Sequence, residues 1–105
     1  MERPQVSDEI LLKAIEVITV GLGKRLQDKG RGAFSSSHEA LGVITEEYDE
    51  LLDAVRGNDI VDISNETIDI AVACVFSIAS FLEKEEELSK AKSQLETELE
   101  EIVQD

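Results

Sequence analysis

The sequence predicts an all-α protein with a four-helix-bundle-like fold in one domain, residues 1–105. Apolar side chains recur every three or four residues along most of the chain, which is the period of a helix that buries one face. The only proline is Pro4, so long helices are not interrupted. No segment alternates apolar and polar residues for long enough to favour a strand over a helix.

The first helix is expected over about Ser7 to Asp28, with Ser7 as its N-cap. Gly21 and Gly23 weaken the expectation that it is unbroken. Its apolar stripe consists of Ile10, Leu11, Ala14, Ile15, Ile18, Leu22 and Leu26.

Residues 30–37 have the composition of a loop. A capping box of Ser36 and Glu39 then opens a second helix, expected over about Ser37 to Arg56. Its predicted core stripe consists of Leu41, Ile44, Tyr48, Leu51, Leu52 and Val55.

A third helix is expected over about Asn65 to Leu82, with Ser64 as its cap. Its uncharged run, residues 70–82, is too short to span a bilayer, so no membrane partner is expected. This helix is apolar on nearly all sides and needs cover on most of them. We therefore expect a homodimer or homotetramer, with Cys74 packed in the core.

Residues 83–105 predict a fourth helix whose apolar positions form a heptad-like seam suited to oligomerisation. The seam consists of Leu88, Ala91, Leu95, Leu99 and Ile102.

The chain is strongly acidic, with 24 Asp and Glu against 10 Lys and Arg and a net charge of −14. A nucleic acid partner held by charge neutralisation is therefore not expected. The single cysteine excludes an internal disulfide, and the sequence shows no signal peptide, which together favour a cytoplasmic location.

The carboxylates are concentrated beside the most apolar segment, with ten acidic residues and one basic residue between 35 and 69. On a helical wheel Glu47 and Glu50 fall on a flank with small or apolar neighbours. Glu66 and Asp69 repeat the three-residue spacing on the next helix. Two antiparallel helices would bring the four acids across from one another, beside small side chains at Ala73, Ser77 and Ser80.

Four such carboxylates repel one another unless a cation lies between them. Oxygen-only ligands suit Mg²⁺, Mn²⁺ or Ca²⁺ better than zinc. The alternative is that these acids form solvated helix faces, with Glu66 near its helix start favoured by the helix dipole alone.

At these residues the sequence resembles the MazG-like all-α nucleoside triphosphate pyrophosphohydrolases. Their signature is Glu-x-x-Glu on one helix and Glu-x-x-Asp on the next, here Glu47 to Glu50 and Glu66 to Asp69. The string HEALGVITEEYDELLDAV and the apolar AVACVFSIAS after Asp69 extend the resemblance over about residues 34–82.

The resemblance implies a MazG-type fold and cleavage of a nucleoside triphosphate to the monophosphate and pyrophosphate. It implies Mg²⁺, with Mn²⁺ as a substitute, bound by Glu47, Glu50, Glu66 and Asp69. Glu47 and Glu50 would also be catalytic. Glu46 matches a further acid of the signature that would orient the attacking water, although the wheel turns it toward solvent.

Basic residues that hold phosphates in many relatives after the Glu-x-x-Asp motif are absent from residues 70–82. Phosphate contacts would then come from Lys24, Arg25, Lys29 or Arg31, or from another subunit; we favour Lys24 and Arg31. Their alternative is an ordinary surface role. Phe34 could stack on the base and His38 could hydrogen-bond to it.

Two other functions stay open. The chain could be a helical assembly or regulatory protein that keeps the scaffold without the chemistry, which the missing basic residues favour and the intact four acids oppose. It could also be a bundle that binds a cation without hydrolytic activity.

Overall fold

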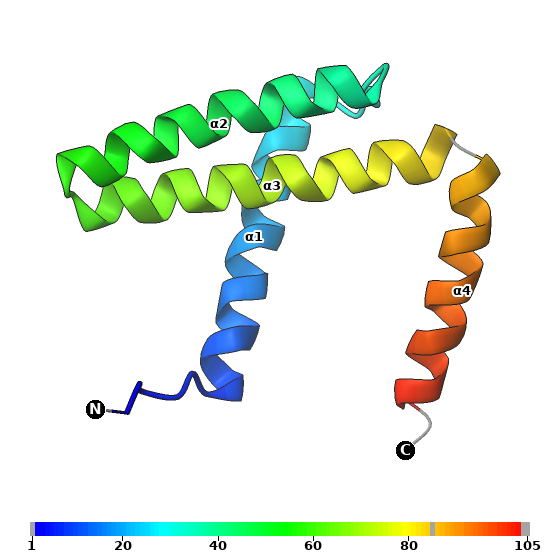
Figure 1. Cartoon of the computed structure of the whole chain (residues 1–105), viewed down its shortest axis with the longest axis horizontal. Coiled ribbons are helices and arrows are strands. Elements are labelled where there is room, and N and C mark those ends of the chain that lie inside the picture. The colour runs from blue at the N-terminus through cyan, green and yellow to red at the C-terminus, as the bar shows by residue number, and fades with distance from the viewer. Residues whose placement is uncertain (1, 85, 104–105) are drawn as a thin grey trace.

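The computed structural model describes residues 2–84 and 86–103, and over these ranges the chain is all-helical, as predicted. The helices are α1 (Asp8–Lys29), α2 (Ser37–Gly57), α3 (Ile60–Lys84) and α4 (Glu86–Val103). Helices α2 and α3 lie side by side in opposite directions, α1 packs across α3, and α4 follows the far end of α3 (Figure 1).

The ends of α1 follow the capping chemistry of the sequence. The Ser7 hydroxyl accepts a hydrogen bond from the N–H of Ile10 at 3.3 Å. The helix continues through Gly21 and Gly23, so the expected weakness there does not break it. It ends at Gly30, which has a φ of 78° and donates its N–H to the Leu26 carbonyl; a positive φ is the conformation that glycine adopts at least cost.

The start of α2 confirms Ser36 as the predicted cap. The return contact of the capping box, from the Glu39 side chain, reaches a residue one position earlier than expected. The Ser36 hydroxyl accepts from the Glu39 N–H at 3.2 Å. The Glu39 carboxylate accepts from the N–H of Ser35 at 2.8 Å, rather than from that of the cap residue itself. The first contact satisfies an N–H group that the first helical turn leaves free, and the second ties the residue before the cap to the helix.

The predicted start of α3 at Asn65, with Ser64 as cap, is wrong, because the helix begins at Ile60. Asn58 ends α2 in the left-handed conformation, with a φ of 57°. The Asp59 carboxylate then accepts hydrogen bonds from the N–H groups two and three residues further on, at 2.9 and 3.3 Å. Asp59 is therefore the cap, and the short connection holds α2 and α3 as an antiparallel pair.

A small core lies where the loop before α2 meets α3. The rings of Phe34 and Phe76 pack edge to face with centroids 5.1 Å apart, and Ala40 is buried beside them. The loop is fixed at Phe34, whose N–H donates to the Ser80 hydroxyl and whose carbonyl accepts from the Lys84 ammonium. This core holds the start of α2 against the second half of α3.

Close approach at Gly21 brings α1 onto α3. A Cβ at this position would lie 3.0 Å from a methyl of Val72 and 3.2 Å from one of Ile68. Contacts this short mean that any side chain at this position would have to push its neighbours aside. Gly23, two residues away, has nothing within 4 Å of the corresponding point.

The predicted core stripe of α2 is only partly correct. Leu41, Tyr48 and Val55 are exposed, whereas the remaining three members, Ile44, Leu51 and Leu52, are half-buried. The flank that carries the buried Ala40 and the carboxylates turns toward α3 instead. A wheel ranks faces by their apolar content, but packing within this chain favours the flank with small side chains, which permits closer approach.

The expected burial of Cys74 is also wrong for the single chain, where this residue is exposed. Within α3 only one face is buried, and Val75 and Ile78 on the other side remain 38% and 57% exposed. In the fourth helix, the seam positions Leu95, Leu99 and Ile102 are exposed. The Leu88 side chain, the first of the seam, lies outside the described residues.

The chain has an open shape. Its radius of gyration is 16.4 Å, compared with about 13 Å for a compact domain of 100 residues. Apolar side chains of α1, including Ile10, Leu12 and Ile15, are more than half exposed. The single chain therefore leaves uncovered much of the apolar surface that its sequence provides.

By length and composition α3 as a whole is sufficient to cross a membrane, although its uncharged run alone is not. Of its most apolar window, 28% is buried inside the chain, and Asp62, Glu66 and Asp69 lie on the same helix. Core helices of soluble proteins meet the same criterion, and the absence of a membrane partner stays a prediction.

The contact at Gly21 can be tested with a matched pair of substitutions. Gly21→Leu should destabilise the fold by about 1–3 kcal/mol, because the new side chain has to displace Val72 and Ile68. Gly23→Leu should leave the stability unchanged or raise it by up to about 1 kcal/mol through helix propensity. Urea unfolding followed by circular dichroism measures both, and equal effects at the two positions would contradict the packing of α1 on α3.

Candidate metal and phosphate site

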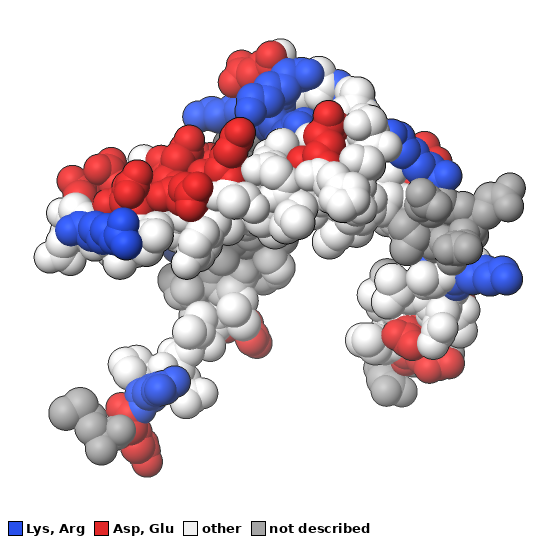
Figure 2. Space-filling view, turned by 45° about the horizontal axis from the view of Figure 1, so that its top comes forward, with Lys and Arg blue, Asp and Glu red and all other residues white. Residues whose placement is uncertain are grey.

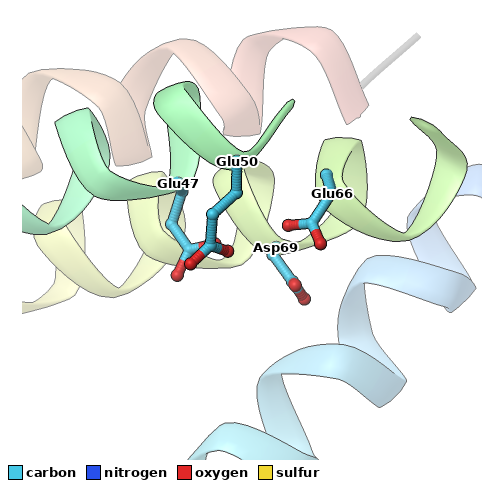
Figure 3. A group of neighbouring side chains, drawn as sticks. All are labelled: Glu47, Glu50, Glu66 and Asp69. Carbon is cyan, nitrogen blue, oxygen red and sulfur yellow. The ribbon is translucent and has the colours of Figure 1, made fainter. Parts of the chain in front are cut away.

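The four predicted acids converge between α2 and α3. One carboxylate oxygen from each of Glu47, Glu50, Glu66 and Asp69 lies within 4.8 Å of the others. Figure 3 shows the side chains reaching from the two helices into the same space. The three-residue spacing puts the two acids of each helix on adjacent turns of one face. Because α2 and α3 are antiparallel neighbours, these two faces lie against each other.

The start of α3 removes one alternative for Glu66. With Ile60 as the first helical residue, Glu66 lies almost two turns into the helix. The effect of the helix dipole is confined to the first turn. The dipole therefore does not account for a carboxylate at this position.

The site is partly enclosed. Glu47 and Glu66 are half-buried, while Glu50 and Asp69 are exposed. One oxygen of Glu47 and one of Glu66, the Oε2 atom in each case, are buried and have no hydrogen-bond partner among the described residues. Buried carboxylate oxygens without a donor are costly, so the arrangement is incomplete without a positively charged or donating group.

Electrostatics point the same way. Burial raises the pKa of Glu47, and repulsion from Glu50, Asp69 and Glu66 raises it further, with partial compensation by Lys29. Burial also raises the pKa of Glu66, together with a hydrogen bond to Glu50 and repulsion from neighbouring carboxylates. Each shift means that the folded chain disfavours the charged form of these groups.

The donor set fits a hard divalent cation. Four carboxylates offer only oxygen ligands, which Mg²⁺, Mn²⁺ and Ca²⁺ prefer. A cation among them would give the two buried oxygens a partner and would offset the mutual repulsion. The geometry does not select Mg²⁺ among these ions.

A pocket of about 280 Å³ lies beside the acids, between them and α1. Lys24, Arg25 and Lys29 line it from the last two turns of α1, and Glu47 and Asp69 line it from the other side. Figure 2 shows acidic side chains gathered over one part of the surface, with basic side chains beside them. Cations and carboxylates therefore face the same small volume.

Arg25 is held in this pocket by aromatic rings. Its guanidinium carbon lies 3.6 Å from the centroid of Phe76 and 5.4 Å from that of Phe34, distances at which a cation and a ring attract one another. Its Nη1 atom is buried and has no hydrogen-bond partner in the described parts of the chain. Burial lowers the pKa of Arg25.

The other predicted site residues are dispersed. Glu46 is exposed on α2 and belongs neither to the acid cluster nor to the pocket. Lys24 lines the pocket, but Arg31 lines a second one of about 510 Å³ together with Phe76 and Ser80.

Phe34 and His38 differ in their surroundings. Phe34 is 6% exposed and packs in the core against Phe76 and Arg25. His38 is exposed and lines neither of the two pockets. Their contacts with a base stay predictions.

No pattern in the sequence predicts the stacking of Arg25 on Phe76. These residues are far apart in the chain and belong to helices of different direction, so no spacing rule links them. The only available signal was the basic composition at the end of the first helix.

The chain matches no protein-family profile, no curated protein and no solved structure.

Removing one acid should stabilise the metal-free protein. Because the pKa of Glu66 is raised on folding, the folded state keeps that proton to higher pH than the unfolded chain. The free energy of unfolding therefore falls as pH rises from the ordinary Glu value toward neutrality. In EDTA at pH 7, Glu66→Gln should melt at a higher temperature than wild type, and the gain should vanish below about pH 4.

Asp53→Asn is the control, because it removes one negative charge from an exposed position of α2. Its effect should be small at both pH values. A Glu66→Gln variant that is no more stable than Asp53→Asn at neutral pH would contradict the repulsion between the acids.

Divalent cations should stabilise the folded chain through the same cluster. At a concentration one hundred times the Kd, Mg²⁺ would add about 2.7 kcal/mol to the free energy of unfolding. Thermal melts should show this gain in wild type and Asp53→Asn, and its loss in Glu50→Gln. An equal gain from NaCl at matched ionic strength would mean that screening, not binding, is responsible.

Proposed function

We propose that the protein is a MazG-like nucleoside triphosphate pyrophosphohydrolase that uses Mg²⁺ to convert a nucleoside triphosphate to the monophosphate and pyrophosphate. The observation that carries the proposal is the convergence of Glu47, Glu50, Glu66 and Asp69 within 4.8 Å. These are the acids that the resemblance to this family singles out. The cationic wall of the adjoining pocket gives additional support.

In this proposal the four carboxylates hold Mg²⁺, with Mn²⁺ as a substitute. When bound, the metal neutralises charge on the phosphate oxygens and makes a coordinated water more acidic. A water oxygen forms a bond to the α-phosphorus, the bond from that phosphorus to the bridging oxygen breaks, and pyrophosphate leaves with the bonding electrons.

The proton of that water needs an acceptor. Glu47 is our first choice, because it belongs to the acid cluster and also lines the pocket beside it. Glu46 is the second choice, since it is exposed on α2 and is not one of the four clustered acids.

We also propose that the active form is a homodimer or homotetramer of MazG type. The open shape of the chain and its exposed apolar side chains on α1, α3 and α4 support this. A second copy would cover surface that a single chain leaves in water. The C-terminal segment 83–105 would take part through its seam.

An assay with nucleotides tests the activity. Ribo- and deoxynucleoside triphosphates are incubated with Mg²⁺, and pyrophosphate and monophosphate are measured. In water enriched in ¹⁸O the label should enter the monophosphate, because attack is at the α-phosphorus. Glu50→Gln and Asp69→Asn should lose on the order of 100-fold or more in activity, while Asp53→Asn should behave as wild type.

The outcome separates the three functions considered for this chain. Pyrophosphate release that depends on Glu50 and Asp69 supports the enzyme. Metal-dependent stabilisation without turnover would indicate a cation-binding bundle. Absence of any metal effect would favour a catalytically silent assembly or regulatory protein.

A further inference from the structure

The pocket beside the acid cluster has two walls of opposite charge. Lys24, Arg25 and Lys29 come from α1, and Glu47 and Asp69 come from the α2–α3 pair. Cationic side chains on one side and a metal ion held by carboxylates on the other are the two components that surround a bound polyphosphate in enzymes that transfer phosphoryl groups. The basic residues of α1 are therefore the candidates for contact with such a ligand.

Arg25 differs from an ordinary surface arginine. Its guanidinium carbon lies over the rings of Phe76 and Phe34, and this contact restricts the side chain before any ligand binds. Its buried Nη1 atom lacks an acceptor among the residues described. A planar donor that already contacts two rings and lacks an acceptor is suited to a phosphate oxygen.

The neighbouring charges limit what the pocket accepts. Asp28 also lines it, so its lining holds as many carboxylates as cations. An anion is therefore opposed until a divalent cation has reduced the negative charge of the acid cluster. Arg31 lines the other pocket and does not contribute here.

We infer that Lys24, Arg25 and Lys29 form a phosphate clamp that holds the β- and γ-phosphates of the substrate and, after cleavage, the pyrophosphate product. The inference rests on the proposed function for the identity of the substrate. It assigns to α1 the role that residues 70–82 cannot fill, because they contain no basic side chain. Pyrophosphate is then a ligand in its own right, bound only together with Mg²⁺ and competing with the nucleotide.

Calorimetric titration with inorganic pyrophosphate tests the phosphate clamp. In Mg²⁺ the wild-type protein should bind pyrophosphate, and in EDTA it should not. Arg25→Lys keeps the charge but loses the planar fork, and should weaken binding by about tenfold. The double variant Lys24→Gln/Lys29→Gln alters only exposed side chains, and should weaken binding by about tenfold or more.

Lys13→Gln is the matched control, because Lys13 is an exposed cation of α1 outside both pockets. It should bind pyrophosphate as wild type does. No binding by wild type in Mg²⁺, unchanged binding in both clamp variants, or an equal loss in Lys13→Gln would each overturn the inference.

Nucleotide turnover on the same samples separates the two proposals. If the wild-type protein binds pyrophosphate through these residues but releases none from nucleotides, the proposed function is contradicted and the phosphate clamp is supported. If the protein turns over nucleotides, pyrophosphate does not inhibit it and KM is unchanged in the clamp variants, the phosphate clamp is contradicted and the proposed function is supported.

Discussion

Repulsion among four carboxylates is the constraint that the packing of α2 against α3 has to overcome. One oxygen from each carboxylate lies within 4.8 Å of the others, and Glu47 and Glu66 each have a buried oxygen without a partner among the described residues. Burial adds to the repulsion, because it withdraws the water that would otherwise screen the charges. The metal-free helix pair is therefore under electrostatic strain at its centre, and a cation is the simplest group that relieves it.

The position of α1 turns this acid cluster into a two-sided site. Gly21 lets α1 approach α3 at Ile68 and Val72, one turn before Lys24 and Arg25. A larger side chain at Gly21 would move those cations away from the acids. Packing and chemistry are thus linked, since the contact that buries apolar surface also sets the distance between the two charged walls.

The sequence alone predicted four helices and the four acids that converge, because caps and i, i+3 spacing are local properties of the chain. It failed where burial depends on partners distant in sequence. Tyr48 and Cys74 belong to apolar stripes but are exposed, and the stacking of Arg25 on Phe76 joins helices that no local pattern relates. The start of α3 differs from the predicted one because Asp59, and not Ser64, caps this helix.

The hypothesis of a silent scaffold has to account for the same charges. A protein that served only as an assembly unit would gain stability by replacing any one of the four acids with a neutral side chain, because each substitution relieves repulsion without removing an apolar contact. The core around Phe34 and Phe76 does not include these acids, so they are not needed to hold the helices together. Retaining all four beside three cations is understandable when a metal and a phosphate ligand complete the site, since each then neutralises charge that the chain leaves unbalanced.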